Sequence, residues 1–136
     1  METTWFCHRG FLRVWKSIEP YVISQLMDPT VEEIVIVGYS HGAALAGIAH
    51  EYVWFNRPDL RENLVSYGFG APRFFWGPMQ KSLKERWKNF HPVRNLDDLV
   101  TNVPPVLFGF HHANKLIIIG KRGLYNLIDA HRPENY

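Results

Sequence analysis

The fold of this chain is decided by residues 34–47, which read IVIVGYSHGAALAG. Residues 34–37 form a short β-branched apolar run, the pattern of a strand that is buried on both faces. The segment at 41–55 that follows is rich in small residues and predicts a helix. The turn between them, Gly38 to Gly42, satisfies G-x-S-x-G, a pattern typical of a sharp strand-to-helix turn that presents a serine hydroxyl.

The residue types of this turn follow from its geometry. Ser40 must adopt a strained backbone conformation, because only a very sharp turn lifts its hydroxyl clear of the sheet. Gly38 and Gly42 are expected because side chains there would collide across the turn. The start of the helix directs backbone N–H groups and a positive dipole end toward the serine, so the N–H of His41 is a natural oxyanion donor. A phosphate-binding loop is disfavoured, since no Lys-Ser or Lys-Thr pair closes the motif.

Helices and strands alternate along the rest of the chain. Residue spacing and apolar runs predict helices at 10–27, 41–55 and 78–88, and strands at 34–37, 64–69, 89–94 and 115–119. Strands separated by helices indicate an α/β fold, a mostly parallel sheet flanked by helices on both sides. The 136 residues contain no repeat, low-complexity tract or linker, so residues 1–136 are predicted to form a single domain.

Composition and charge exclude several other classes of protein. Hydrophobic residues make up 46% and charged residues 21% of the chain, as in ordinary globular proteins. Lys and Arg number 15 and Asp and Glu 13, and the resulting net charge of +2 predicts no nucleic-acid partner. The single cysteine, Cys7, excludes an internal disulfide and a cysteine-rich zinc site.

No segment of the sequence has the character of a membrane span or a leader. The longest apolar run, residues 42–49, is far shorter than the ~18 residues of a membrane helix. The first residues lack the basic and apolar regions of a signal peptide. The sequence therefore leaves the location of the protein unknown, with the cytoplasm as the default expectation.

A serine alcohol is a weak nucleophile, so Ser40 needs a base, and the base needs an acid to orient it. After such a turn the chain order is serine, acid, histidine, and both partners follow the carboxyl ends of strands. Asp98 follows the third predicted strand and His131 follows the last one. Asp97 is the alternative acid, and His112 is the principal alternative base. We expect the side chain of His41 to project away from the hydroxyl.

The chain resembles the class 3, or fungal-type, lipases in a series of segments spanning residues 8–136. The matching segments are, in order, HRGF at 8–11, GYSHGAALA at 38–46, YGFGAPR at 67–73, DLVTNVPP at 98–105, FHH at 110–112, and His131 with Tyr136. The register of the fourth segment selects Asp98 over Asp97. Tyr39 and His41 stand where the family motif usually has histidine and leucine.

The resemblance implies an α/β-hydrolase fold and the hydrolysis of carboxylic esters, often lipid esters. By analogy the catalytic triad is Ser40, Asp98 and His131, working through an acyl-enzyme without metal or cofactor. The implied partner is an ester or lipid substrate, with transient contact at a lipid surface. The sequence names no substrate-binding residue, since the aromatic residues at 74–76, 108 and 110 fit either an acyl-binding cleft or the core.

One element of the family is not found in this sequence. Family members carry an earlier strand ending in R-G-T or R-G-S, which supplies the second oxyanion donor, and residues 1–7 do not resemble it. We therefore expect an amino-terminally truncated domain that lacks the first strands of the sheet. The strand at 34–37 would then have an unpaired edge through which the protein could self-associate. The alternative is a catalytically impaired or partner-completed binding module with a hydrolase fold.

Overall fold

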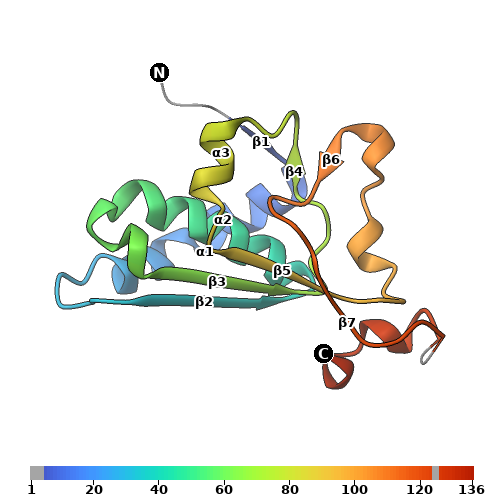
Figure 1. Ribbon diagram of the computed structural model, residues 1–136. Coiled ribbons are helices and arrows are strands. Elements are labelled where there is room, and N and C mark those ends of the chain that lie inside the picture. The colour runs from blue at the N-terminus through green and yellow to red at the C-terminus, as the bar shows by residue number, and fades with distance from the viewer. Residues whose placement is uncertain (1–4, 124–125) are drawn as a thin grey trace.

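The computed structural model describes residues 5–123 and 126–136, whose main sheet has four strands in the order β2-β3-β5-β7 (Figure 1). These strands are β2 Ile34–Tyr39, β3 Leu64–Phe69, β5 Phe90–Asn95 and β7 Ile117–Ile119. All neighbouring strands run parallel, and β2 and β3 pair without a bulge, from Ile34 opposite Leu64 to Tyr39 opposite Phe69. The predicted α/β class and parallel sheet are confirmed. That residues 1–136 form a single domain stays a prediction.

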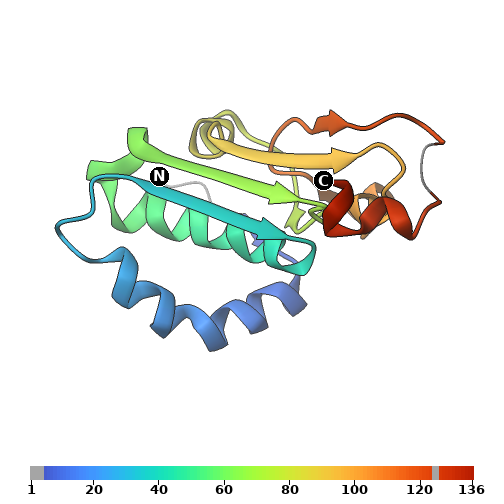
Figure 2. The same cartoon turned by 90° about the horizontal axis from the view of Figure 1, so that it is seen from below.

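The helices α1 Arg9–Leu26, α2 His41–Asn56 and α3 Lys81–Arg86 all lie on one face of this sheet (Figures 1 and 2). The expectation of helices on both sides is wrong for the described part of the chain. Trp15 of α1 packs on Ile48 and Ala49 of α2, so the apolar stripe of α1 is buried against a helix and not against the second face. That face carries the exposed Val35 and Val37, which are 58% and 63% accessible.

A second, small sheet consists of β1 Phe6–Cys7, β4 Phe75–Trp76 and β6 Phe110–His111, paired antiparallel. It was not expected, because strands this short carry no detectable periodicity. Turns of 3₁₀-helix occupy much of the connecting chain: η1 Pro58–Asn63, η2 Val100–Asn102, η3 Val106–Phe108, η4 Asp129–His131 and η5 Pro133–Asn135. The segments η2 and η4 lie beside the residues that the sequence proposes for catalysis.

The core forms where α2 lies against the sheet. Ala43, Ala44 and Val53 of α2 are fully buried, because small side chains allow the helix to approach the strands closely. A cluster of large aromatic side chains continues the core beyond Ala44: Phe74, Phe75, Trp87 and Phe90. Phe74 and Phe75 are therefore core residues, whereas Trp76 and Phe108 are 43% and 64% exposed.

Strand β2 lies at the edge of the main sheet and pairs only with β3 among the described residues. The self-association predicted through this edge stays a prediction. Within the described part of the chain, none of the helices combines the length and hydropathy needed to cross a membrane.

Replacing Gly47 by alanine is expected to destabilise the protein by about 1–3 kcal/mol through overpacking. A Cβ atom at this position would lie 2.2 Å from Cζ of the buried Phe74. The matched control is Gly42→Ala, where an added Cβ meets nothing within 4 Å and the change should be neutral or slightly stabilising. Urea unfolding of both variants measures the difference, and equal free energies of unfolding would contradict the prediction.

Candidate active site

The turn between β2 and α2 holds Ser40 in a rare backbone conformation. Its φ of 55° and ψ of −122° make it the only non-glycine residue with positive φ in the described ranges. The backbone N–H of Ser40 donates to the carbonyl oxygen of Phe69 at 2.8 Å, and its own carbonyl accepts from Ala43 at 3.0 Å. Such a conformation costs about 1–3 kcal/mol, and the neighbouring strand and the helix hold it in place. The strained turn predicted from the motif is present.

The two glycines of the motif differ in whether a side chain would fit at their positions. A Cβ on Gly38 would lie 2.2 Å from the carbonyl oxygen of Gly42, so Gly38 is required by the close approach of the backbone. The expectation that a side chain at Gly42 would also collide is wrong, because its Cβ would point into open space. Of the two glycines, only Gly38 has neighbouring backbone atoms in the space that a Cβ would occupy.

Three side chains from separate segments form a continuous hydrogen-bonded chain. Oγ of Ser40 lies 2.8 Å from Nε2 of His131, and Nδ1 of His131 lies 2.8 Å from Oδ2 of Asp98. Ser40 lies in the turn after β2, Asp98 in the turn after β5, and His131 at the end of η4. The carboxylate accepts the Nδ1–H, which leaves Nε2 free to accept the serine proton.

The carboxylate of Asp98 is fully buried, and further donors satisfy it. The backbone N–H of Val100 donates to Oδ1 at 2.8 Å, and the hydroxyl of Tyr136 donates to Oδ2. Burial, and then the hydrogen bond to Asp98, raise the pKa of Tyr136 well above its ordinary value, so this hydroxyl keeps its proton. Asp98 is thus held on both oxygens, and Oδ2 faces the imidazole of His131.

The other candidates from the sequence lie elsewhere. Oδ2 of Asp97 accepts the backbone N–H of Gly123 at 2.6 Å. Nε2 of His112 donates to the carbonyl oxygen of Thr101 at 2.8 Å. The ring of His41 packs against Phe11, while its backbone begins α2 directly after Ser40. The structure therefore brings His131 to Ser40 and Asp98 to His131, whereas Asp97 and His112 are hydrogen-bonded to other groups.

A buried amide that the sequence analysis did not single out anchors the segment that carries His131. Asn95, the last residue of β5, is fully buried, and its Nδ2 lies 3.1 Å from the carbonyl oxygen of Ala130 and 3.3 Å from that of Asn135. These acceptors lie on either side of His131 in the sequence. A polar residue at the carboxyl end of a buried strand is the signal that could have drawn attention to it.

Two arginines hold the loop that follows Asp98. Nη2 of Arg73 and Nη1 of Arg94 both lie close to Oδ1 of Asn102, at 3.2 and 3.1 Å. Arg73 also donates to the carbonyl oxygens of Asn102 and Pro104. This loop is therefore tied to β5 and to the segment after β3, which restricts the position of the acid.

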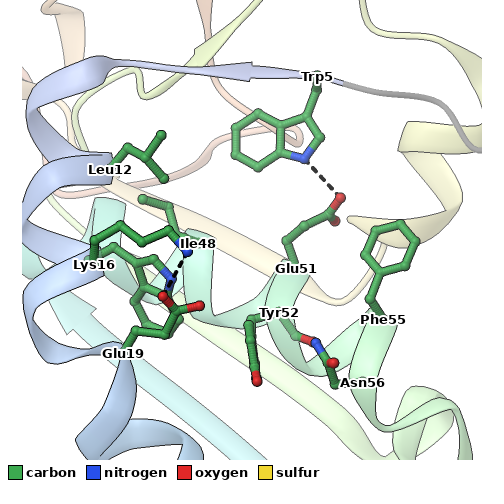
Figure 3. Close-up of a pocket in the computed structure, with 10 residues that line it drawn as sticks. Trp5, Leu12, Lys16, Glu19, Ile48, Glu51, Tyr52, Phe55 and Asn56 are labelled. Carbon is green, nitrogen blue, oxygen red and sulfur yellow. Dashed lines mark hydrogen bonds and ion pairs between the residues drawn. The ribbon is translucent and has the colours of Figure 1, made fainter.

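Two pockets differ in their relation to these residues. One of about 290 Å³ lies beside the hydrogen-bonded chain and is lined by Tyr39, Phe69, Pro133 and Tyr136. Another of about 240 Å³ lies between α1 and α2 and has none of the three side chains in its wall (Figure 3). In that second pocket the indole of Trp5 donates to Glu51, as Figure 3 shows. Glu51 also pairs with the buried Arg86 at 2.7 Å, so its charge has a partner within the core.

A parallel sheet in which a strand–serine–helix turn meets a histidine and a buried acid defines the α/β-hydrolase class. A sequence model described as Lipase (class 3) matches residues 4–108. The chain belongs to the class 3 lipase family, and the resemblance drawn from its motifs is confirmed.

Individual relatives agree with this assignment. The chain is 26% identical over 112 residues to secreted mono- and diacylglycerol lipase 1 of Fusarium solani, covering 79% of this chain and 32% of that protein. It is 28% identical over 110 residues to a lipase of Rhizopus niveus, covering 77% of this chain and 28% of that protein. The chain therefore spans about a third of the length of these relatives.

Solved structures show the same fold. The lipase of Rhizopus microsporus var. chinensis superimposes with a TM-score of 0.69 at 25% identity, covering 88% of this chain and 46% of that one. The Rhizomucor miehei lipase in its propeptide complex gives a TM-score of 0.73 at 22% identity, covering 90% of this chain and 41% of that one. The α/β-hydrolase architecture is thus shared with fungal lipases over most of the chain.

The default expectation of a cytoplasmic location is wrong. Relatives from Fusarium solani and Malassezia restricta are named as secreted lipases. A single unpaired cysteine is equally compatible with an oxidising compartment, and a leader is a segment separate from the folded domain, so neither observation supports the cytoplasm.

The stability of the protein should fall as the pH drops from about 6.5 to about 4, because one buried histidine stays neutral in the folded protein and takes up a proton when the chain unfolds. His50 is 1% exposed, bonded to Ser66 and to the carbonyl oxygen of Arg86, and burial lowers its pKa from 6.5 to about 4. In this window the unfolded chain binds the proton and the folded protein does not, so acid favours unfolding by about 3 kcal/mol.

Urea unfolding at pH 7 and pH 4.5 tests this expectation. His50→Gln keeps an amide donor and acceptor but cannot be protonated, and it should lose less stability on acidification than the wild type. His41→Gln, an exposed position, serves as the control and should behave like the wild type. Equal acid sensitivity of His50→Gln and the wild type would exclude His50 as the cause.

Proposed function

We propose that this chain carries the catalytic part of a serine hydrolase that cleaves carboxylic esters, with lipid esters as its substrate class. The observation that carries the proposal is the hydrogen-bonded chain from Oγ of Ser40 through His131 to the buried Asp98. Membership of the class 3 lipase family supports the same reaction. The activity of the whole protein is a proposal, because the chain spans only part of its relatives.

In the first half of the proposed reaction, Oγ of Ser40 attacks the ester carbonyl carbon while Nε2 of His131 takes the hydroxyl proton. Asp98 keeps its hydrogen bond to Nδ1–H and stabilises the imidazolium by its negative charge. His131 then gives the proton to the departing alcohol oxygen as the carbon–oxygen bond breaks. An acyl-enzyme remains on Ser40 and the alcohol is released.

The second half repeats these steps with water as the nucleophile. His131 takes a proton from the water as its oxygen attacks the acyl carbon, and the tetrahedral intermediate collapses when His131 returns the proton to Ser40. The carboxylic acid leaves and the free serine is restored. The side chain of His131 is 22% exposed, so water can reach it.

The oxyanion that develops in both halves requires backbone donors. The N–H of His41, at the start of α2, is the donor we assign. Loss of a single oxyanion donor typically costs on the order of 10²–10³ in rate, so a second donor decides how active the site is.

The alternative function is a catalytically impaired or partner-completed module, and the edge position of β2 favours it. A strand from another polypeptide can pair with such an edge. The two candidates differ in one result: an enzyme hydrolyses esters by itself, whereas a partner-completed module does so only after a second chain is added.

Contact with a lipid surface is proposed for an exposed apolar group beside β6. Leu107 is 90% exposed and Phe108 64% exposed in η3, and the indole of Trp76 donates to the carbonyl oxygen of Phe108 at 2.9 Å. Exposed apolar groups of this kind commonly mark surfaces for lipid or protein. The names of the relatives as mono- and diacylglycerol lipases support lipid as the partner.

A fluorophosphonate probe should label Ser40, and the variant Ser40→Ala should lose both the label and at least ~10³-fold of the hydrolysis of a soluble short-chain ester. Asp98→Asn should reduce turnover by roughly 10⁴-fold, because the wrong imidazole tautomer is then favoured. Peptide mapping by mass spectrometry locates the label. Ser66, which is also bonded to a histidine but is fully buried, should remain unlabelled. Ester hydrolysis that survives in Ser40→Ala would refute the assignment.

A further inference from the structure

Tyr39 connects the nucleophile to its base in two ways. It directly precedes Ser40 in the chain, and its side chain contacts His131. We infer that Tyr39 is a positioning residue that holds the imidazole of His131 in the plane needed for proton transfer. This inference rests on the proposed hydrolase function.

The contacts of Tyr39 reach both the ring and the backbone of His131. The two rings stack with their centroids 5.2 Å apart and their planes inclined by 24°. The hydroxyl of Tyr39 donates to the backbone carbonyl oxygen of His131. A single side chain therefore stacks on the imidazole and is also hydrogen-bonded to the backbone from which the imidazole extends.

This stacking supplies a restraint that Asp98 does not. The hydrogen bond from Nδ1 of His131 to Asp98 fixes the direction of one nitrogen, but the ring can still turn about that bond. A turn of this kind moves Nε2 away from Oγ of Ser40, which lies 2.8 Å from it. The tyrosine ring stacked on the imidazole opposes this turn, because the turn would break the contact between the two rings.

The hydroxyl of Tyr39 keeps its proton and remains a donor. Partial burial, and then the negative charges of Asp98 and Glu134, raise the pKa of Tyr39 above its ordinary value. Tyr136, whose hydroxyl donates to Asp98, stands edge-on to Tyr39 with ring centroids 6.1 Å apart. The two tyrosines thus form adjacent supports, one for the base and one for the acid.

A histidine, the usual residue of the family motif at this position, cannot replace this contact. Its ring ends well before the position of the tyrosine hydroxyl, so it does not reach the carbonyl of His131. Tyr39→Phe removes the hydrogen bond and keeps the stacked ring, whereas Tyr39→His removes the reach of the side chain as well.

Poor positioning of His131 should have a distinctive chemical signature. His131 must protonate an alkoxide leaving group, but a nitrophenolate leaves without a proton. Hydrolysis of an alkyl ester should therefore suffer more than hydrolysis of the nitrophenyl ester of the same acid. A merely structural role would lower both rates in proportion to the folded fraction and leave their ratio unchanged.

The experiment compares the wild type with Tyr39→Phe, Tyr39→His and the control Tyr67→Phe. Tyr67 lies on the same face of the sheet, with its ring against Phe69 and His91 instead of His131. We expect the ratio of alkyl to nitrophenyl ester kcat to fall about tenfold or more in Tyr39→His and less in Tyr39→Phe, with KM unchanged. Tyr67→Phe should keep the wild-type ratio. An unchanged ratio in both Tyr39 variants, with Ser40-dependent hydrolysis retained, overturns the inference.

Hydrogen exchange followed by mass spectrometry separates this inference from the proposed function. Tyr39→Phe should raise amide exchange selectively in residues 126–136, whether or not the chain hydrolyses esters. If the wild type shows no Ser40-dependent hydrolysis, the proposed function fails, and the exchange result still decides the anchoring role. Exchange in residues 126–136 that equals that of the wild type and of Tyr67→Phe overturns it.

Discussion

The buried carboxylate of Asp98 is the group on which the site depends. A fully buried charge must be hydrogen-bonded, and this one receives the N–H of Val100, the imidazole of His131 and the hydroxyl of Tyr136. Its donors come from its own loop and from the end of the chain. Satisfying the carboxylate therefore draws the carboxyl-terminal segment against the sheet, and His131 reaches Ser40 as part of the same arrangement.

The parallel sheet brings Ser40, Asp98 and His131 together without long connecting segments. Because the strands run parallel, the carboxyl ends of β2, β5 and β7 all point to the same end of the sheet, and the segments that follow them lie close together. The cost is concentrated at Ser40, whose φ of 55° is strained. Backbone hydrogen bonds to Phe69 and from Ala43 hold the strained residue, and Asn95 and Tyr39 secure the histidine that faces it.

Much of the architecture could be predicted from the sequence, because short runs of residues of one type indicate individual strands and helices. The β-branched run at 34–37 and the small residues of α2 indicate a buried strand with a helix packed closely over it. The patterns did not reveal the sheet of β1, β4 and β6, since its two-residue strands depend on partners far away in the sequence. They also suggested helices on both faces, whereas α1 packs on α2 and leaves the second face open.

By itself the sequence determined the α/β class, the strained turn at Ser40 and the order of serine, acid and histidine, because motif spacing and residue type carry that information. The resemblance to the family already favoured Asp98 over Asp97, but only the tertiary structure shows that His131 lies beside Ser40 and Asp98 beside His131, while Asp97 and His112 have other hydrogen-bond partners. It also decided the positions of Asn95 and Tyr39, whose roles depend on contacts with residues more than thirty positions away. Such contacts arise when strand ends are brought together, and no local pattern encodes them.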